Sequence, residues 1–214
     1  MRRESSTVVA LVGEVGDGGD GADGLLDGLA RAPNVAVAQA RPAKAGQPAA
    51  QEAAKVRPGW EAGALALREA ARRQSTYVIV PDDPLADVAA QWRAMWDVPG
   101  GSRGAAGFEQ SAADVLAAWR GKQFELPDYY LVMAAPAQPG GTGPDLYLGP
   151  LRAARPRRVA VVGSTDSMPA QVAGLLDALS SLEYGPWWPP LDELLDTARR
   201  FYAGGLAETQ PTPA

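Results

Sequence analysis

The 214-residue chain contains no histidine and no cysteine. Without histidine, it lacks the side chain that most often serves as a general base near neutral pH. Without cysteine, it has no thiol nucleophile and no disulfide, and neither a Ser-His-Asp nor a Cys-His arrangement can be assembled. Zinc sites built from these two residue types are excluded for the same reason. The chemistry still open to the chain uses carboxylates, hydroxyls, arginine and three lysines.

Long apolar runs are also missing from the chain. No stretch approaches the roughly 20 apolar residues that cross a bilayer as a helix. The basic start at residues 1–3 is followed by a short apolar run, Thr7–Val12, and then by Glu14 and Asp17, which does not match a secretory signal peptide. We therefore expect a soluble, cytoplasmic protein without a membrane span. The net charge of −5 argues against nucleic acid as its partner.

Five apolar runs alternate with segments of helical periodicity. The runs have the length of buried strands, and they are Thr7–Val12, Asn34–Ala38, Thr76–Val80, Tyr129–Ala135 and Arg158–Gly163. Apolar side chains recurring every three or four residues predict the main helices, at Ala22–Arg31, Trp60–Arg73, Leu85–Trp96, from Ser111 onward, Val172–Leu182 and Leu191–Tyr202. Such alternation favours a mainly parallel sheet with helices on both faces. The sequence predicts a three-layer α/β fold, Rossmann-like or flavodoxin-like, with a five-stranded sheet.

The organisation along the chain indicates one domain. We expect a single α/β domain over residues 1–205 and a disordered tail over residues 206–214, because Gly204 and Gly205 end the last predicted helix. The proline-containing stretch 41–58 and the glycine-rich stretch Val98–Gly107 are expected to be irregular connections, the second of them mobile. The excess of arginine over lysine, with abundant alanine, glycine and proline, is typical of a GC-rich bacterial genome.

The loop after the first predicted strand is rich in glycine and in acidic residues. Gly16, Gly18 and Gly21 match G-x-G-x-x-G between a strand and a helix, where dinucleotide-binding folds hold a pyrophosphate. The carboxylates of the same loop would repel a phosphate, and the stretch from Gly18 to Leu26 also matches a calcium-binding nonapeptide. Gly13, Gly16 and Gly18 are therefore candidate ligand-binding residues, and the simpler interpretation is a flexible acidic loop.

An acidic pair, Asp82 and Asp83, follows the third predicted strand. In parallel sheets the ligands bind beyond the carboxyl ends of the strands, so this pair could meet Glu14 or Asp17 there. Carboxylate oxygens are the ligands that Mg²⁺ prefers, and a metal site of these four residues is one hypothesis. The alternative is a turn followed by a helix cap, since Pro-Asp-Asp-Pro suits both.

Two further segments flank the fifth predicted strand. Ser164 and Thr165 follow it and precede a helix, where hydroxyl and backbone N–H groups could bind an anion or could simply cap the helix. The basic cluster Arg152–Arg158 precedes it and could bind an anion or an acidic partner, or form a solvated strand entrance.

Trp187 and Trp188 stand between prolines, which restrict the backbone that carries these two large rings. The rings could cover a groove within the chain or anchor another protein, as aromatic hot spots do. With the last predicted helix they define a candidate partner surface, made of Trp187, Trp188, Phe201 and Tyr202.

No complete catalytic motif emerges from these patterns, so the leading hypothesis is a non-catalytic protein without a cofactor. It would be a regulatory or assembly component of a larger bacterial complex, acting through contacts with another protein. The alternative is a protein that binds a nucleotide or phosphate ligand, such as a Mg²⁺-dependent phosphotransferase or hydrolase. That alternative would use Glu14, Asp17, Asp82 and Asp83 with Mg²⁺ and a nucleotide.

Overall fold

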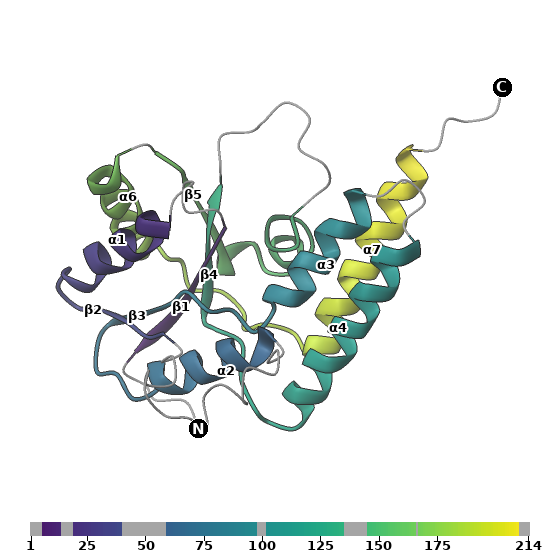
Figure 1. The fold of residues 1–214 in the computed structure, drawn as a ribbon, viewed down its shortest axis with the longest axis horizontal. Coiled ribbons are helices and arrows are strands. Elements are labelled where there is room, and N and C mark those ends of the chain that lie inside the picture. Colours follow the sequence, from purple (N-terminus) through teal and green to yellow (C-terminus); the bar gives the residue numbers. More distant parts are fainter. Residues whose placement is uncertain are drawn as a thin grey trace.

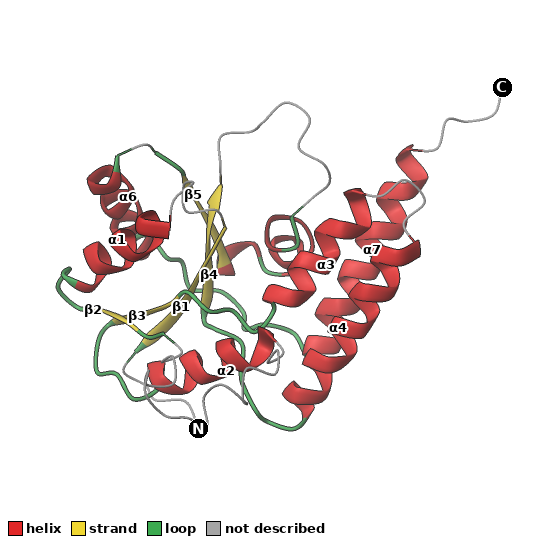
Figure 2. Ribbon diagram, in the orientation of Figure 1, coloured by secondary structure: helices red, strands yellow, loops and turns green. Residues whose placement is uncertain are grey.

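Five parallel strands form one sheet in the order β2-β3-β1-β4-β5 (Figures 1 and 2). The computed structural model describes residues 6–13, 19–39, 59–97, 102–134, 145–165 and 167–209. The strands are β1 (Thr7–Gly13), β2 (Val35–Val37), β3 (Tyr77–Val80), β4 (Tyr129–Ala134) and β5 (Val159–Gly163). The predicted five-stranded parallel α/β fold is confirmed, and each strand lies within or one residue beyond its predicted run.

The helices are divided between the two faces of the sheet (Figure 1). One face carries α1 (Gly19–Ala30) and α6 (Met168–Ser180). The other carries α2 (Gly59–Ala70), α3 (Ala86–Asp97), α4 (Ser102–Arg120) and α7 (Leu191–Thr209), with the short segments η2 (Tyr147–Leu151), α5 (Arg152–Ala154) and η3 (Pro156–Arg158). The division follows from handedness. Because crossovers between parallel strands are right-handed, the β1–β2 connection, which runs opposite to the later ones along the sheet, places α1 on the opposite face.

The alternation of side chains along β1 feeds two separate cores. Val9 and Leu11 pack toward α1 and α6, whereas Ala10 and Val12 pack toward the helices of the other face. In the second core an aromatic cluster joins three helices, because Trp92 of α3 lies with its ring centroid 5.8 Å from that of Phe108 in α4 and 6.2 Å from that of Tyr202 in α7. The three long helices therefore pack as one layer.

Glycines in α4 allow it to pack closely against α3. The helix begins at Ser102, so the prediction of a mobile connection over Val98–Gly107 is wrong for its second half; residues 98–101 lie outside the described residues, as does the predicted connection 41–58. The physical reason is visible at Gly104, where an added Cβ would lie 2.7 Å from the Cα of Met95. The glycine-rich composition predicted an irregular connection, but Gly104 instead lies at the contact between α3 and α4.

The last helix is longer than predicted. Helix α7 continues across Gly204 and Gly205 to Thr209, and residues 210–214 lie outside the described residues. An added Cβ at Gly204 would meet no atom within 4 Å, so this glycine is not required by packing.

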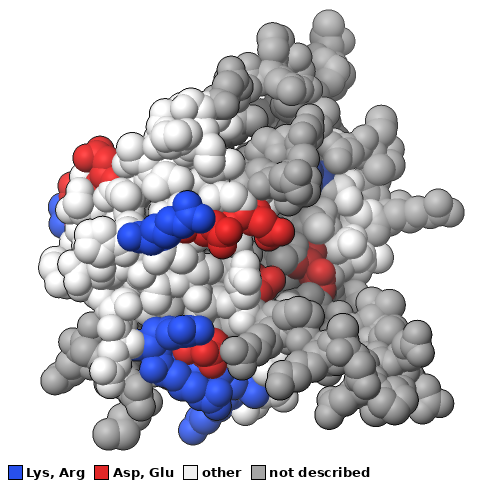
Figure 3. All heavy atoms as spheres, turned by 60° about the vertical axis from the view of Figure 1, so that its left-hand side comes forward, with Lys and Arg blue, Asp and Glu red and all other residues white. Residues whose placement is uncertain are grey.

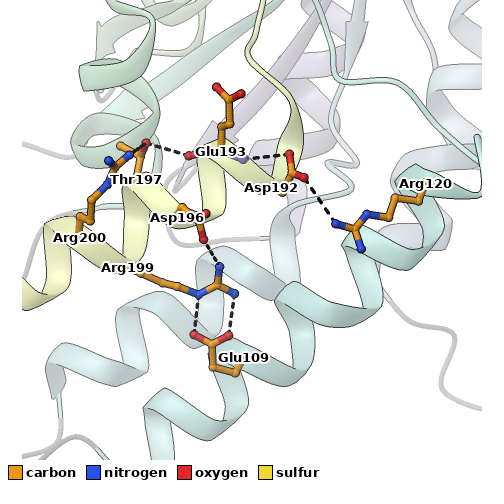
Figure 4. Close-up of polar contacts among 8 residues, drawn as sticks. All are labelled: Glu109, Arg120, Asp192, Glu193, Asp196, Thr197, Arg199 and Arg200. Carbon is orange, nitrogen blue, oxygen red and sulfur yellow. Dashed lines mark hydrogen bonds and ion pairs between the residues drawn. The ribbon is translucent and has the colours of Figure 1, made fainter.

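An ion-pair network connects α7 to α4 (Figure 4). The Arg199 guanidinium donates to both carboxylate oxygens of Glu109, at 2.8 and 2.7 Å, and also to Asp196 at 2.6 Å. These hydrogen bonds lower the pKa of Glu109 and raise the pKa of Arg199. Both side chains are substantially exposed, so the pair contributes at most about 1 kcal/mol to stability.

Charged side chains on the face shown in Figure 3 gather mainly in two groups, and each basic group lies next to acidic side chains. Arg72 and Arg73, which follow α2, form ion pairs with Glu69 of that helix. Among the described residues, no helix combines the length and apolar character needed to cross a membrane.

Two glycine-to-alanine substitutions test the helix packing. Gly104→Ala should destabilise the protein by about 1–3 kcal/mol, because the new methyl group forces α3 and α4 apart. Gly204→Ala should stabilise it by about 0.5–1 kcal/mol, because alanine favours the helix and nothing opposes its side chain. Urea unfolding of both variants measures the two changes. Equal effects of the same sign would contradict the close α3–α4 contact.

Candidate functional site

The carboxyl end of β1 requires glycine for a packing reason. Gly13 has φ +110°, and a Cβ added there would collide with the backbone carbonyl oxygen of Met133 on β4. The residue is thus explained by the close approach of two strands, without a ligand. The other candidates of this loop, Glu14, Gly16, Asp17 and Gly18, lie outside the described residues, so their assignments stay predictions.

Asp83 is buried in a polar cluster beyond β3. It is 4% exposed and accepts hydrogen bonds from the hydroxyls of Tyr130 (3.1 Å) and Tyr147 (2.6 Å). Both phenol rings are themselves buried, and their centroids lie 5.2 Å apart. The carboxylate therefore faces the protein interior. Asp82 beside it is only half-buried.

Burial dominates the protonation of Asp83. Desolvation raises the pKa of its carboxyl group to about 6, although the hydrogen bonds from Tyr147, the Leu85 backbone and Tyr130 act in the opposite direction. The pKa values of both tyrosines are raised well above their usual range by burial and by the nearby carboxylate. Among the described residues, no three acidic side chains converge as metal ligands would. The Mg²⁺ hypothesis therefore depends on Glu14 and Asp17, which lie outside that part of the chain.

The raised pKa gives Asp83 a measurable effect on stability. The folded protein binds a proton that the unfolded chain releases, so the stabilisation is complete below pH 3.8 and is lost as pH rises through about 6. The shift corresponds to about 3 kcal/mol. We expect the stability difference between wild type and Asp83→Asn to fall by about this amount between pH 4 and 7, as measured by urea unfolding at a series of pH values. A difference that stays constant across this range would contradict the assignment.

Ser164 and Thr165 lie where β5 leads into α6. The Thr165 backbone N–H donates to the Gln171 side-chain oxygen at 2.8 Å, and its hydroxyl donates to the Ser167 carbonyl oxygen at 3.1 Å. Gln171 is 4% exposed, and within the part of the chain that the structure describes its side-chain nitrogen Nε2 has no hydrogen-bond partner. The structure thus brings the two predicted residues together with a buried glutamine that the sequence reasoning did not select.

Arginines of the basic cluster bind the chain that precedes α7. Arg158 is 8% exposed and donates to the carbonyl oxygens of Asp128, Gly185 and Pro186 at 2.8–3.1 Å. Arg155 donates to the Trp187 carbonyl oxygen at 2.6 Å. These two side chains therefore hold backbone segments together through hydrogen bonds, which corrects the expectation of a solvated strand entrance. Arg152 remains exposed.

The two adjacent tryptophans have different environments. Trp188 is 5% exposed, donates its ring N–H to the Pro127 carbonyl oxygen at 2.7 Å and packs edge-on against Tyr130, so its ring belongs to the core and is not available as a surface anchor. Trp187 is half-buried, with the Arg158 guanidinium carbon 4.7 Å from its ring centroid.

The other two predicted surface residues lie on α7. Phe201 is 38% exposed, whereas Tyr202 packs edge-on against Trp96 with ring centroids 5.0 Å apart. Of the candidate partner surface, Trp188 is therefore buried and Phe201 is exposed, whereas Trp187 and Tyr202 are half-buried.

Trp187 lines two neighbouring cavities of about 480 and 880 Å³ near the amino ends of β1 and β4. The cavities share the segment Lys122–Leu126 as a wall, and we call them together the Trp187 groove. Further lining comes from α2, at Leu67 and Arg68, and from Pro189 and Pro190. Sequence reasoning missed Lys122, which follows α4 with φ 56°, because only the fold brings it to Trp187.

Arg158 can be tested against a neighbour of the same residue type. Arg158→Lys should destabilise the protein by about 2–3 kcal/mol, because one ammonium group cannot satisfy three carbonyl oxygens in the fixed geometry of a guanidinium. Arg152→Lys at an exposed position should change stability by less than about 0.5 kcal/mol. Thermal and urea unfolding measure both; equal stability of the two variants would contradict the fastening role.

No family model, no curated protein and no solved structure matches this chain significantly. The case for function therefore rests on the residues and geometry of this molecule.

Proposed function

We propose that this protein is a non-catalytic component of a larger protein assembly. In this proposal the Trp187 groove binds an extended segment of a partner protein that carries apolar side chains next to an acidic one. The observation that carries the proposal is the position of Trp187. Its partly accessible aromatic ring lines two cavities and packs against the Arg158 guanidinium.

The contacts that hold Trp187 in place support a binding role, because they reduce the conformational entropy that is lost on association. The Arg158 guanidinium lies against the Trp187 ring, and Arg155 donates a hydrogen bond to the Trp187 carbonyl oxygen. The residue that follows, Trp188, is buried in the core. An aromatic side chain held in this way loses little conformational freedom when a partner covers it. Large rings presented in pockets are the residues that most often dominate binding energy.

The charges along the groove favour an acidic partner segment. Arg68, Arg120 and Lys122 line its walls and are exposed. The acidic residues of the lining are Glu125 and Asp128, and the Asp128 carboxylate accepts a hydrogen bond from the Val8 backbone N–H at 2.8 Å. Because Arg120 also forms an ion pair with Asp192 of α7 at 3.5 Å, a partner carboxylate beside the apolar contact would complement mainly Arg68 and Lys122.

The surroundings of Asp83 favour a structural role for this residue over a catalytic one. Its pKa is raised toward the range of a general acid or base. However, both carboxylate oxygens are occupied by buried tyrosine hydroxyls, so a substrate could reach them only after the cluster opens. The buried cluster is better explained as a structural connection among β3, β4 and η2.

A peptide selection tests the proposed function. The full-length protein is screened against a phage-displayed random peptide library, and selected peptides are synthesised and titrated by calorimetry. We expect peptides with apolar and acidic residues, and binding at least about 30-fold weaker for Trp187→Ala, as for an aromatic hot spot. Lys122→Glu should weaken binding several-fold, with a larger effect at low salt.

Tyr184→Ala is the matched control, because Tyr184 is an aromatic residue of the same connection that is 91% exposed and does not line the groove. It should bind the peptides like wild type. Far-UV circular dichroism establishes that each variant is folded. Peptides that bind wild type and Trp187→Ala equally would overturn the proposal.

A further inference from the structure

A second candidate site lies at the amino end of α6, on the face of the sheet opposite to α2, α3, α4 and α7. It goes beyond the proposed function and shares no residue with the Trp187 groove. The site follows the carboxyl end of β5, where parallel α/β sheets bind their ligands. Next to it, the space that a side chain at Gly163 would occupy is open.

The first turn of α6 presents hydrogen-bond donors. The first N–H groups of a helix have no acceptor within the helix, and Ser167 at the N-cap makes no side-chain hydrogen bond to them. Pro169 has no N–H, so the donors of this turn are Met168 and Ala170, whereas the Gln171 N–H binds the Ser167 carbonyl oxygen. The partial positive charge of the helix end adds to their attraction for an anion.

Gln171 supplies the independent observation that points to a ligand. Its side chain leans toward the amino end of the helix, as helical side chains do, and its oxygen is held by the Thr165 N–H. The carboxamide therefore lies beside Thr165, and this contact fixes which of its ends is the oxygen. Its nitrogen Nε2 carries two N–H donors on a residue that is 4% exposed, and it has no hydrogen-bond partner among the described residues. Leaving such a buried donor unpaired is destabilising, and a ligand that supplies an acceptor would remove this cost.

We propose that the amino end of α6 binds the phosphoryl group of a phosphorylated ligand. The Gln171 Nε2 and the N–H groups of Met168 and Ala170 would donate to its oxygens. A phosphoryl group fits this set because it offers three acceptor oxygens in a tetrahedral arrangement to donors that converge from a helix end and a side chain. Ser164, predicted from the sequence as a ligand residue, adds a half-buried hydroxyl beside them.

Nuclear magnetic resonance of the ¹⁵N-labelled full-length protein tests the site with inorganic phosphate as the probe. At constant ionic strength maintained with chloride, phosphate should produce saturable shifts in the Gln171 side-chain amide and in the backbone amides of Met168 and Ala170. Acetate at the same concentrations should leave them unchanged. Absence of shifts up to 50 mM phosphate, or equal shifts with acetate, would overturn the proposal.

Substitution of the glutamine isolates its donor. Gln171→Glu keeps an oxygen for the Thr165 N–H but replaces the donor by a negative charge, so phosphate affinity should fall at least tenfold. Gln110→Glu is the matched control, because Gln110 is an exposed residue of α4 on the other face of the sheet. This variant should bind phosphate like wild type. Unchanged affinity in Gln171→Glu would contradict the role of Nε2. Trp187→Ala should retain the phosphate response, so this test and the peptide test can fail separately.

Discussion

The buried guanidinium of Arg158 donates hydrogen bonds to backbone carbonyl oxygens of segments that are distant in the sequence. Its three donated hydrogen bonds join the start of β4 to the connection between α6 and α7, at Asp128, Gly185 and Pro186. The group is buried between the rings of Tyr129 and Trp187, with centroid distances of 4.9 and 4.7 Å. A guanidinium suits this position because its planar fork can bind several carbonyl oxygens and still stack on aromatic faces.

The position of α7 depends on this connection. Trp188 follows directly and is anchored in the core by its hydrogen bond to the Pro127 carbonyl oxygen, and α7 starts three residues later at Leu191. From there the helix packs with α3 and α4 through Trp92 and Tyr202, and its surface is linked to α4 through Arg199 and Glu109. The Trp187 groove exists because the same connection is held against the amino ends of the strands.

The two ends of the sheet thus have different physical characters. At the carboxyl ends, β3 leads into the closed, tyrosine-covered Asp83, and β5 leads into a helix end with an unpaired amide. At the amino ends, apolar walls and three basic side chains surround a half-buried ring. The proposed binding of a protein segment at one end and the proposed binding of a phosphoryl group at the other are compatible, since the two sites lie on different elements.

The sequence by itself determined that five strands form one parallel sheet and that helices alternate with these strands along the chain. Apolar runs such as Thr76–Val80 have the length of buried strands and are too short for helices. The helical periodicity between them leaves few alternatives to an α/β fold. It also predicted that Ser164 and Thr165 lie between the fifth strand and a helix, because that position follows from the order of elements. The helix boundaries were less accessible. Gly104 and Gly204 look alike in the sequence, although one is required by contact with α3 and the other by nothing.

Only the tertiary structure decided which polar and aromatic side chains are buried. Arg158, Asp83 and Gln171 resemble their exposed neighbours in the sequence, and Trp187 cannot be distinguished there from Trp188. The carbonyl groups that bind Arg158 and the tyrosine hydroxyls that bind Asp83 are 27 to 64 positions away, so no local sequence pattern predicts these contacts. A side chain is buried when distant segments supply its hydrogen bonds and remove its water, and that is a property of the packed chain.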